Sequence, residues 1–176
     1  MRPSQHFHHC PRCGARQANP PAGDVFTCDA CGFTLYFSSA NATAAFIQHD
    51  DGKVLFIRRA KEPAKGKLAP PGGFIDVGET AEQGVRREIR EEVGLEITDI
   101  QFLCSQPNSY LYQDVAYPVL DFFFTARAIA PERARALDDV TGFCWLEPEQ
   151  VSPDDIAFPS MRAALAFWLE RRRTRA

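Results

Sequence analysis

Residues 73–95 read GFIDVGETAEQGVRREIREEVGL, and their pattern predicts a helix over residues 80–93. Thr80 and Gln83 are spaced as a capping box, and Gly94 is a suitable helix stop. At about 100° per residue, three carboxylates fall on one arc of about 100°, which adjoins the apolar stripe and does not oppose it. The carboxylates belong to Glu88, Glu91 and Glu92, and the stripe consists of Ala81, Val85, Ile89 and Val93.

Carboxylates so close together repel one another, by a few tenths of a kcal/mol per pair on a helix. Arginines on the same helix relieve part of the repulsion, and Mg²⁺ or Mn²⁺ would relieve it more directly because these ions prefer oxygen ligands. Helix geometry alone leaves a solvated charged helix and a metal site open. The loop Pro70-Pro71-Gly72-Gly73 favours the metal site, since it can bring backbone groups against a metal-bound phosphate.

The same segment resembles the Nudix box. The family pattern is glycine, five residues, glutamate, seven residues, and then Arg-Glu-apolar-x-Glu-Glu-x-Gly-apolar. Every fixed position is matched, by Gly73, Glu79, Arg87, Glu88, Ile89, Glu91, Glu92, Gly94 and Leu95. With its flanking strands the resemblance covers roughly residues 42–172. It implies an α/β fold, the α/β/α sandwich of the Nudix superfamily around a mixed sheet.

The resemblance also implies an activity, the metal-dependent hydrolysis of a pyrophosphate bond with Mg²⁺ or Mn²⁺ as cofactor. Glu88, Glu91 and Glu92 would bind the metal, and the Gly73 carbonyl would be a further ligand. Divalent metals suit this reaction because they neutralise the substrate phosphates and lower the pKa of a bound water.

The attacking water must also lose a proton to a carboxylate. Glu91 or Glu92 could accept it from the helix. Many family members use an acidic residue of a later loop instead, for which Asp139 is the candidate, with an ordinary turn aspartate as the alternative. Glu79 would pair with Arg87 and orient the helix against the loop, which is a supporting role and not a catalytic one.

Two C-x-x-C pairs lie near the N-terminus, and each is followed by a glycine. Such turns present four thiolates to a tetrahedral Zn²⁺, and glycine tolerates the positive φ at which the chain leaves the turn. A disulfide framework is the alternative, which a reducing cytosol disfavours. We therefore expect a zinc ribbon over residues 1–39 and a Nudix domain over residues 40–176. The ligands would be Cys10, Cys13, Cys28 and Cys31.

The remaining pattern predicts strands and a second helix. The strands are expected over residues 44–47, 54–57, 97–105, 117–128 and 142–146, and the helix over residues 160–172. Residues 19–24 are expected to link the halves of the ribbon. Cys104 and Cys144 are expected to be buried thiols, the histidines near the ribbon to be surface residues, and the basic C-terminal residues to complement the helix dipole. These are His6, His8 and His9, and Arg171, Arg172, Arg173 and Arg175.

A four-cysteine ribbon ahead of a Nudix box resembles the bacterial NADH pyrophosphatase group. That group carries Ser-Gln-Pro-Trp-Pro-Phe-Pro-x-Ser soon after the box. This chain keeps Ser105-Gln106-Pro107 but continues with Asn108-Ser109-Tyr110-Leu111. We therefore expect a substrate loop here, with a shallow preference among several compounds of the NADH type. Tyr110, Tyr112 and Tyr117 could stack on a base, or could simply pack within a hairpin.

Function classes can be compared on these features. An enzyme that releases a nucleoside monophosphate is favoured, because a nucleotide-sensing binding module needs no complete set of glutamates. A nucleoside diphosphate sugar hydrolase is the second alternative. The net charge of −3 and the few basic residues of the ribbon argue against nucleic acid as a partner. No apolar run approaches the ~20 residues that span a bilayer, so we expect a cytoplasmic protein with a small nucleotide as substrate. Homodimers are common in the group that the chain resembles, so the resemblance implies a homodimer.

Overall fold

A computed structural model describes residues 2–17, 21 and 23–174. Residues 19, 20 and 22 of the expected ribbon loop, and Arg175 of the basic tail, lie outside these ranges. The chain divides into two compact units. The first comprises Met1–Ala40 and Ser109–Val119, and the second comprises Asn41–Asn108 and Leu120–Ala176.

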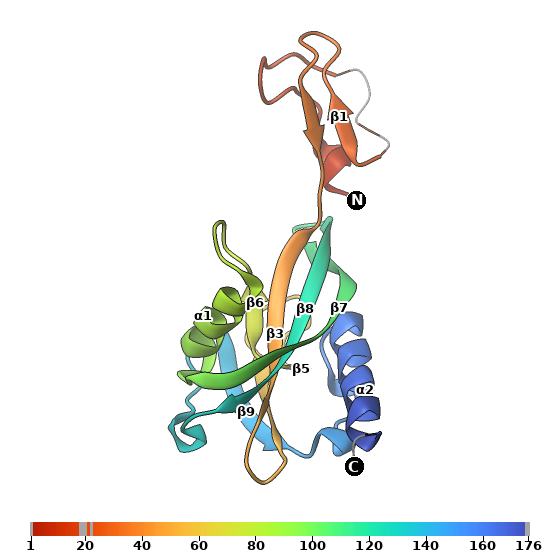
Figure 1. The fold of residues 1–176 in the computed structure, drawn as a ribbon. Coiled ribbons are helices and arrows are strands. Elements are labelled where there is room, and N and C mark those ends of the chain that lie inside the picture. The colour runs from red at the N-terminus through yellow and green to blue at the C-terminus, as the bar shows by residue number, and fades with distance from the viewer. Residues whose placement is uncertain (1, 18–20, 22, 175–176) are drawn as a thin grey trace. The chain divides into compact units, whose positions relative to one another are not determined.

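The N-terminal part of the first unit is a small ribbon. It contains a 3-10 helix, η1 (Pro3–His6), and an antiparallel pair of strands, β1 (Val25–Thr27) and β2 (Thr34–Tyr36) (Figure 1). Its core is limited to a few side chains, which are Cys10, Phe26 and Cys28 with Phe7, Ala15, Phe33, Leu35 and Phe37 around them. So small a core rarely stabilises a fold without a cross-link or a bound metal.

The second unit is built on a seven-stranded sheet. Its strands are β3 (Ala40–Gln48), β4 (Val54–Arg59), β5 (Leu68–Ala69), β6 (Gly72–Phe74), β7 (Ile97–Tyr112), β8 (Val115–Ala128) and β9 (Val140–Leu146). The main path runs β5-β4-β3-β8-β7, while β6 pairs with β3 and β9 pairs with β4, both antiparallel. Neighbours β3 and β8 run in the same direction, so the sheet is mixed, as expected (Figure 1).

Two helices, α1 (Ala81–Val93) and α2 (Pro159–Arg173), lie on opposite sides of this sheet (Figure 1). The α/β/α sandwich is therefore confirmed, and β3 and β4 are buried almost continuously because both of their faces are covered. Three 3-10 helices complete the unit, η2 (Pro131–Arg133), η3 (Pro148–Gln150) and η4 (Pro153–Asp155). Within the described residues, no helix has the length and apolar character needed to cross a bilayer.

Local sequence signals set the ends of α1 as expected. Thr80 and Gln83 form a reciprocal capping box, with Gln83 N donating to Thr80 Oγ1 at 3.2 Å and Thr80 N donating to Gln83 Oε1 at 2.8 Å. Gly94 ends the helix in the left-handed region, with φ of 67°. These contacts satisfy backbone groups that a helix end leaves without partners.

The α2 side of the sheet carries an aromatic core. Phe46 of β3 stacks on Phe123 of β8 and on Trp168 of α2, with ring centroids 6.2 and 5.1 Å apart. Cys104 and Cys144, which were expected to be buried, pack half-buried against this core, and burial raises the pKa of both thiols.

Basic side chains near the C-terminal end of α2 pack on aromatic rings of the same helix. The Arg171 guanidinium lies 5.6 Å from the Phe167 ring centroid, and that of Arg172 lies 4.9 Å from the Trp168 ring centroid. These contacts hold both guanidinium groups against aromatic rings of α2, and the interaction of the arginines with the helix dipole stays a prediction.

Ser105–Pro107 were expected to lie in a loop, but β7 continues as a strand to Tyr112, and their role in substrate binding stays a prediction. A two-residue turn joins β7 to β8, and Gln113 and Asp114 both have positive φ, 46° and 64°, as a tight hairpin turn requires. β7 is the edge strand of the main path, where a proline such as Pro107 need not interrupt the hydrogen-bond ladder.

Candidate active site

Two glycines allow the segment before α1 to approach both the sheet and the helix. β6 pairs with β3 so that Gly72 lies opposite Ala44 and Gly73 opposite Thr43. A Cβ atom on Gly72 would lie 2.1 Å from the Thr43 carbonyl oxygen, and one on Gly73 would lie 2.5 Å from the Glu88 carboxyl group. A side chain at position 72 would clash with the backbone of β3, so glycine is needed there, whereas a side chain at position 73 would displace the Glu88 carboxyl group.

Arg87 ties α1 to this loop. Its Nε and Nη2 atoms donate to the two oxygens of Glu79 at 2.8 and 3.0 Å, and Nη2 also donates to the Phe74 carbonyl at 2.9 Å. Hydrogen bonding from Arg87 lowers the pKa of Glu79. The expected Glu79–Arg87 pair is therefore present. Nη1 of Arg87 also donates to Glu88 at 2.8 Å and to Glu91 at 3.0 Å, so one guanidinium is shared by three carboxylates.

Glu92 is the most buried of the three helix glutamates, with 8% of its surface exposed. Its Oε2 accepts a hydrogen bond from the Gly72 amide at 2.8 Å. Burial raises the pKa of Glu92 to about 8, and the nearby charges of Glu88 and Asp139 add to the rise, while the Gly72 amide opposes it. Burial also raises the pKa of Glu88. Two carboxyl groups of the site are therefore costly to ionise, and a bound cation would favour their ionised forms.

The three glutamates share one side of α1, but their oxygens do not converge on one point. Among the described residues, the four ribbon cysteines form the only group of three or more potential metal-binding side chains with ligand atoms within 4.8 Å of one another. Glu88 and Glu91 turn to Arg87, whereas Glu92 turns to Gly72.

The loop ahead of β9 packs on the C-terminal end of α1. The amides of Leu137 and Asp138 donate to carbonyl oxygens in the last turn of α1 at 2.9 and 3.3 Å. Asp139 follows with φ of 56°, and its carboxylate forms an ion pair with Lys61. The negative charge of Asp139 contributes to the raised pKa of Glu92, so this candidate base lies near the glutamates of α1.

Arg59 is a cation near Glu92 that sequence reasoning missed. The pairing of β4 with β9 shifts register between Arg58 and Arg59, and such a bulge re-aims a side chain. Arg59 Nε donates to the Pro63 carbonyl at 3.0 Å, and its guanidinium lies 5.0 Å from the Phe158 ring centroid. Its charge lowers the pKa of Glu92. No local pattern could reveal this position, which depends on strands far apart in sequence.

The residues expected to form a substrate loop lie along β7. Consecutive side chains of a strand point to opposite faces. Gln106 and Tyr110 are half-buried, whereas Ser105 and Pro107 are exposed, and Tyr112 is exposed near the hairpin turn. The strand thus separates Gln106 from its two neighbours in the signature.

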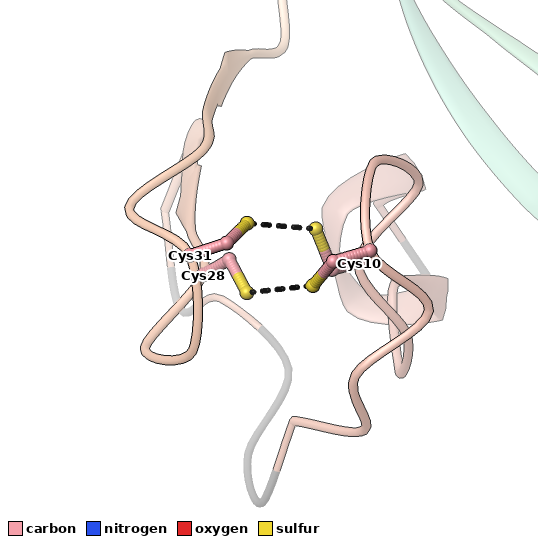
Figure 2. A group of neighbouring side chains, drawn as sticks. Cys10, Cys28 and Cys31 are labelled. Carbon is pink, nitrogen blue, oxygen red and sulfur yellow. Dashed lines mark hydrogen bonds between the residues drawn. The ribbon is translucent and has the colours of Figure 1, made fainter.

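The ribbon cysteines, in contrast, are gathered into one cluster. Figure 2 shows Cys10 facing Cys28 and Cys31, and the Sγ atoms of Cys10 and Cys31 are 3.8 Å apart. In each C-x-x-C turn the following glycine has positive φ, 74° and 70°, and donates its amide to the carbonyl of the first cysteine at 2.9 Å. All four thiols are free, and the nearby histidines are exposed, as expected.

Comparisons with known proteins identify relatives of this chain. The model of the NUDIX domain matches residues 39–167. An ADP-ribose pyrophosphatase of Methanocaldococcus jannaschii is 48% identical over 63 residues, which are 36% of this chain and 37% of that protein. The NAD-capped RNA hydrolase NudC of Pseudomonas aeruginosa is 25% identical over 169 residues, 96% of this chain and 58% of that protein. This chain therefore spans less than two thirds of either relative.

The fold comparison agrees. The crystal structure of a NUDIX hydrolase from Nitrosomonas europaea superposes with a TM-score of 0.71 at 20% identity, over 96% of this chain and 93% of that one. Fold, glutamate helix and family model coincide on the same residues, and the chain belongs to the NUDIX domain family.

Proposed function

We propose that this protein hydrolyses the pyrophosphate bond of a nucleoside diphosphate derivative of the NADH, NAD⁺ or ADP-ribose type and releases a nucleoside monophosphate. The observation that carries the proposal is the Glu92 carboxylate, buried on the Gly72 amide beside Glu88 and Glu91 on α1. A buried carboxylate next to further acidic groups is costly for folding, and it is retained where chemistry needs it.

The residues present fit a hard divalent cation, Mg²⁺ or Mn²⁺. Every donor is an oxygen, from Glu88, Glu91, Glu92 and the Gly73 carbonyl, and such donors suit these ions. When bound, the cation neutralises charge on the diphosphate and lowers the pKa of a water. The raised pKa values of Glu88 and Glu92 support this assignment, because nearby positive charge would favour their ionised forms.

Two arginines position the glutamate helix and supply positive charge to the site. Arg87, held by Glu79, fixes α1 against the loop that presents the Gly73 carbonyl. Arg59 adds positive charge on the Glu92 side, where a phosphate oxygen can be bound.

A carboxylate must accept the proton of the attacking water. The candidates are Glu91, Glu92 and Asp139. Support is strongest for Glu92, because the carboxylates of Asp139 and Glu91 are already paired with Lys61 and Arg87.

The proposed substrate class follows the relatives named as ADP-ribose pyrophosphatase and NAD-capped RNA hydrolase. The signature part kept by this chain, Ser105-Gln106-Pro107, lies on a strand that separates its side chains between two faces. We therefore propose a preference of less than ~10²-fold among NADH, NAD⁺ and ADP-ribose, the range of discrimination reached by apolar or aromatic contacts without a dedicated hydrogen-bonding pocket.

Zn²⁺ is the proposed ion of the cysteine cluster. Four thiolates are the ligand set of a closed structural site, and the two turns present them within 4.8 Å of one another. We propose that residues 1–39 form this structural ribbon and residues 40–176 the hydrolase domain. The homodimer and the cytoplasmic location also stay predictions from the sequence.

Steady-state kinetics on a nucleotide panel test the proposal. With Mg²⁺, NADH, NAD⁺, ADP-ribose and FAD should each yield AMP, with comparable kcat/KM values. A preference for NADH above ~10³-fold would show that the altered signature still specifies nicotinamide. Cleavage restricted to sugar nucleotides, or to nucleoside triphosphates, would overturn the proposed substrate class.

A further inference from the structure

Gln17 is a buried amide side chain in the ribbon, outside both proposed sets of metal ligands. Only 7% of its surface is exposed. Burying an amide is costly unless its polar atoms form hydrogen bonds. The Nε2 atom of Gln17 donates to the Sγ atom of Cys28 at 3.4 Å, and Cys28 itself is 1% exposed. The amide is therefore directed at the sulfur atom of a proposed zinc ligand.

A short hairpin around the first C-x-x-C turn places this amide. The backbone amide of Cys10 donates to the Ala15 carbonyl at 2.9 Å, and that of Gln17 donates to the His8 carbonyl at the same distance. Side chains alternate along an extended chain, so Ala15 and Gln17 lie on one side and Arg16 on the other. Ala15 packs on the ribbon core and Gln17 is buried, whereas Arg16 is exposed.

The hydrogen bond joins the two halves of the ribbon, because Gln17 follows the first C-x-x-C turn and Cys28 begins the second. Four thiolates around one Zn²⁺ leave the cluster with a net negative charge. Hydrogen-bond donors next to sulfur stabilise such charge. The backbone amides of Ala30 and Cys31, in the second turn, also donate to the Cys28 sulfur. Gln17 adds a side-chain donor from the opposite half.

We propose that Gln17 is a positioning residue of the ribbon metal site, whose amide orients the Cys28 thiolate and raises the affinity of the four cysteines for Zn²⁺. This assignment rests on the proposed zinc site and deepens it. Partners that hydrogen-bond to metal ligands typically contribute about 10- to 100-fold in metal affinity, because they fix the orientation of the ligand and tune its basicity. The same contact helps to bring both halves of the ribbon around the ion.

Competition between the full-length protein and a chromogenic chelator measures the affinity for Zn²⁺. Gln17→Met keeps the length of the side chain but removes the donor, and it should lower the affinity about 10- to 100-fold. Gln17→Glu should cause a larger loss, because a carboxylate would face the thiolate. Gln5→Met removes the amide of an exposed glutamine in the same ribbon and should leave the affinity unchanged.

Substitution of Co²⁺ for zinc separates a contact with sulfur from a role in packing. A donor on the thiolate lowers the energy of the sulfur electrons. The sulfur-to-cobalt charge-transfer absorption of Gln17→Met should therefore lie at longer wavelength than that of the wild type, whereas a loss of packing would lower Tm and leave the absorption in place. Wild-type zinc affinity in Gln17→Met, or a lower Tm with unchanged absorption, would overturn the assignment.

Cadmium NMR of the wild-type protein tests the contact even if the ribbon of the variants does not fold. With an NMR-active cadmium isotope in place of zinc, a hydrogen bond to sulfur transmits a scalar coupling from the donated proton to the metal. We expect such a coupling for the side-chain amide of Gln17, beside those of the backbone donors. Couplings from backbone amides alone would overturn this assignment and leave the zinc site intact. A wild-type protein that binds none of the three ions would overturn both.

Discussion

The two candidate metal centres differ in how far the protein itself assembles the ligands. In the ribbon, four sulfur atoms lie within 4.8 Å of one another, on two turns that each end in a glycine. On α1, three carboxylates share one side, but Arg87 holds Glu88 and Glu91 while Glu92 turns to Gly72. The first arrangement is that of a closed structural site, and the second leaves room for a cation, a water and a phosphate.

The difference teaches that similar sequence regularity can encode different degrees of assembly. Soft thiolates on fixed turns are ready for one ion and exclude substrate. Buried carboxylates with raised pKa values gain from a cation brought with the substrate. The ribbon metal should therefore matter for folding, and the helix metal for turnover.

The largest expected effect is on turnover. Glu92→Gln, and likewise Glu91→Gln, keeps the shape of the side chain but removes the charge that a metal or a proton needs. Each should lower kcat at saturating Mg²⁺ by at least ~10²-fold without lowering Tm. Glu96→Gln, at an exposed glutamate beyond the helix, is the matched control. Normal turnover by Glu92→Gln would show that the carboxylates are not the reaction centre.

Glu79→Gln should have an intermediate effect. It weakens the bidentate pair that holds Arg87. The loop and α1 are then held less firmly in position, but no metal ligand is removed. We expect kcat to fall about 10-fold, less than for the ligand glutamates, because only positioning is affected. Glu82→Gln, in the exposed first turn of α1, is the control. A loss as large as that of Glu92→Gln would mean that Glu79 itself acts on the metal or substrate.

Cys28→Ser should change turnover least. We expect about one zinc per chain in the wild type and less in the variant, with unfolding confined to the ribbon. The kcat of the variant should stay within a factor of about 5 of the wild type, which corresponds to ~1 kcal/mol in the barrier. Elemental analysis, NMR of the ribbon amides and kinetics check these three points. Metal-free protein with a disulfide between the pairs would contradict the zinc assignment.

The pH dependence of stability sharpens the contrast from the carboxylate side. In the folded protein the pKa of Glu92 is raised from 4.5 to about 8. Above pH 4.5 the unfolded chain therefore releases a proton that the folded chain keeps, so stability is lost as pH rises from 4.5 to about 8. In EDTA, Glu92→Gln should escape this loss and melt at least ~3 °C above the wild type at pH 8.5, about 1 kcal/mol for a domain of this size. If the Tm values of the wild type and of Glu92→Gln change with pH in parallel from pH 5 to 8.5, the raised pKa of Glu92 is contradicted.

Local signals made α1 predictable to within a residue. The capping box at Thr80, the stop at Gly94 and the carboxylate arc all depend on residues within one helix. The four cysteines were equally local, because each turn is complete in five residues. Metal ligands that share a short segment can thus be read without tertiary information.

The missed features depend on where each strand lies in the sheet. β7 was predicted to end at residue 105 but continues to Tyr112, because an edge position tolerates Pro107. Arg59 follows a bulge against β9, and its charge lowers the pKa of Glu92. The buried Asp121 of β8 carried a readable signal, a single acid in an apolar strand, but its hydrogen-bond partners, Asn108 on β7 and Ser160 on α2, could not be foreseen.

Phosphorus NMR of ADP-ribose incubated with the zinc-loaded protein tests the central claim most directly, because it observes the bond itself. With Mg²⁺, the two diphosphate resonances should disappear together and be replaced by two phosphomonoester resonances, those of AMP and ribose 5-phosphate, with no inorganic phosphate. With EDTA in place of Mg²⁺ at a concentration that leaves the zinc bound, or with Glu92→Gln, the diphosphate should persist. Diphosphate that survives with Mg²⁺, or that is cleaved equally well without it, would contradict the account.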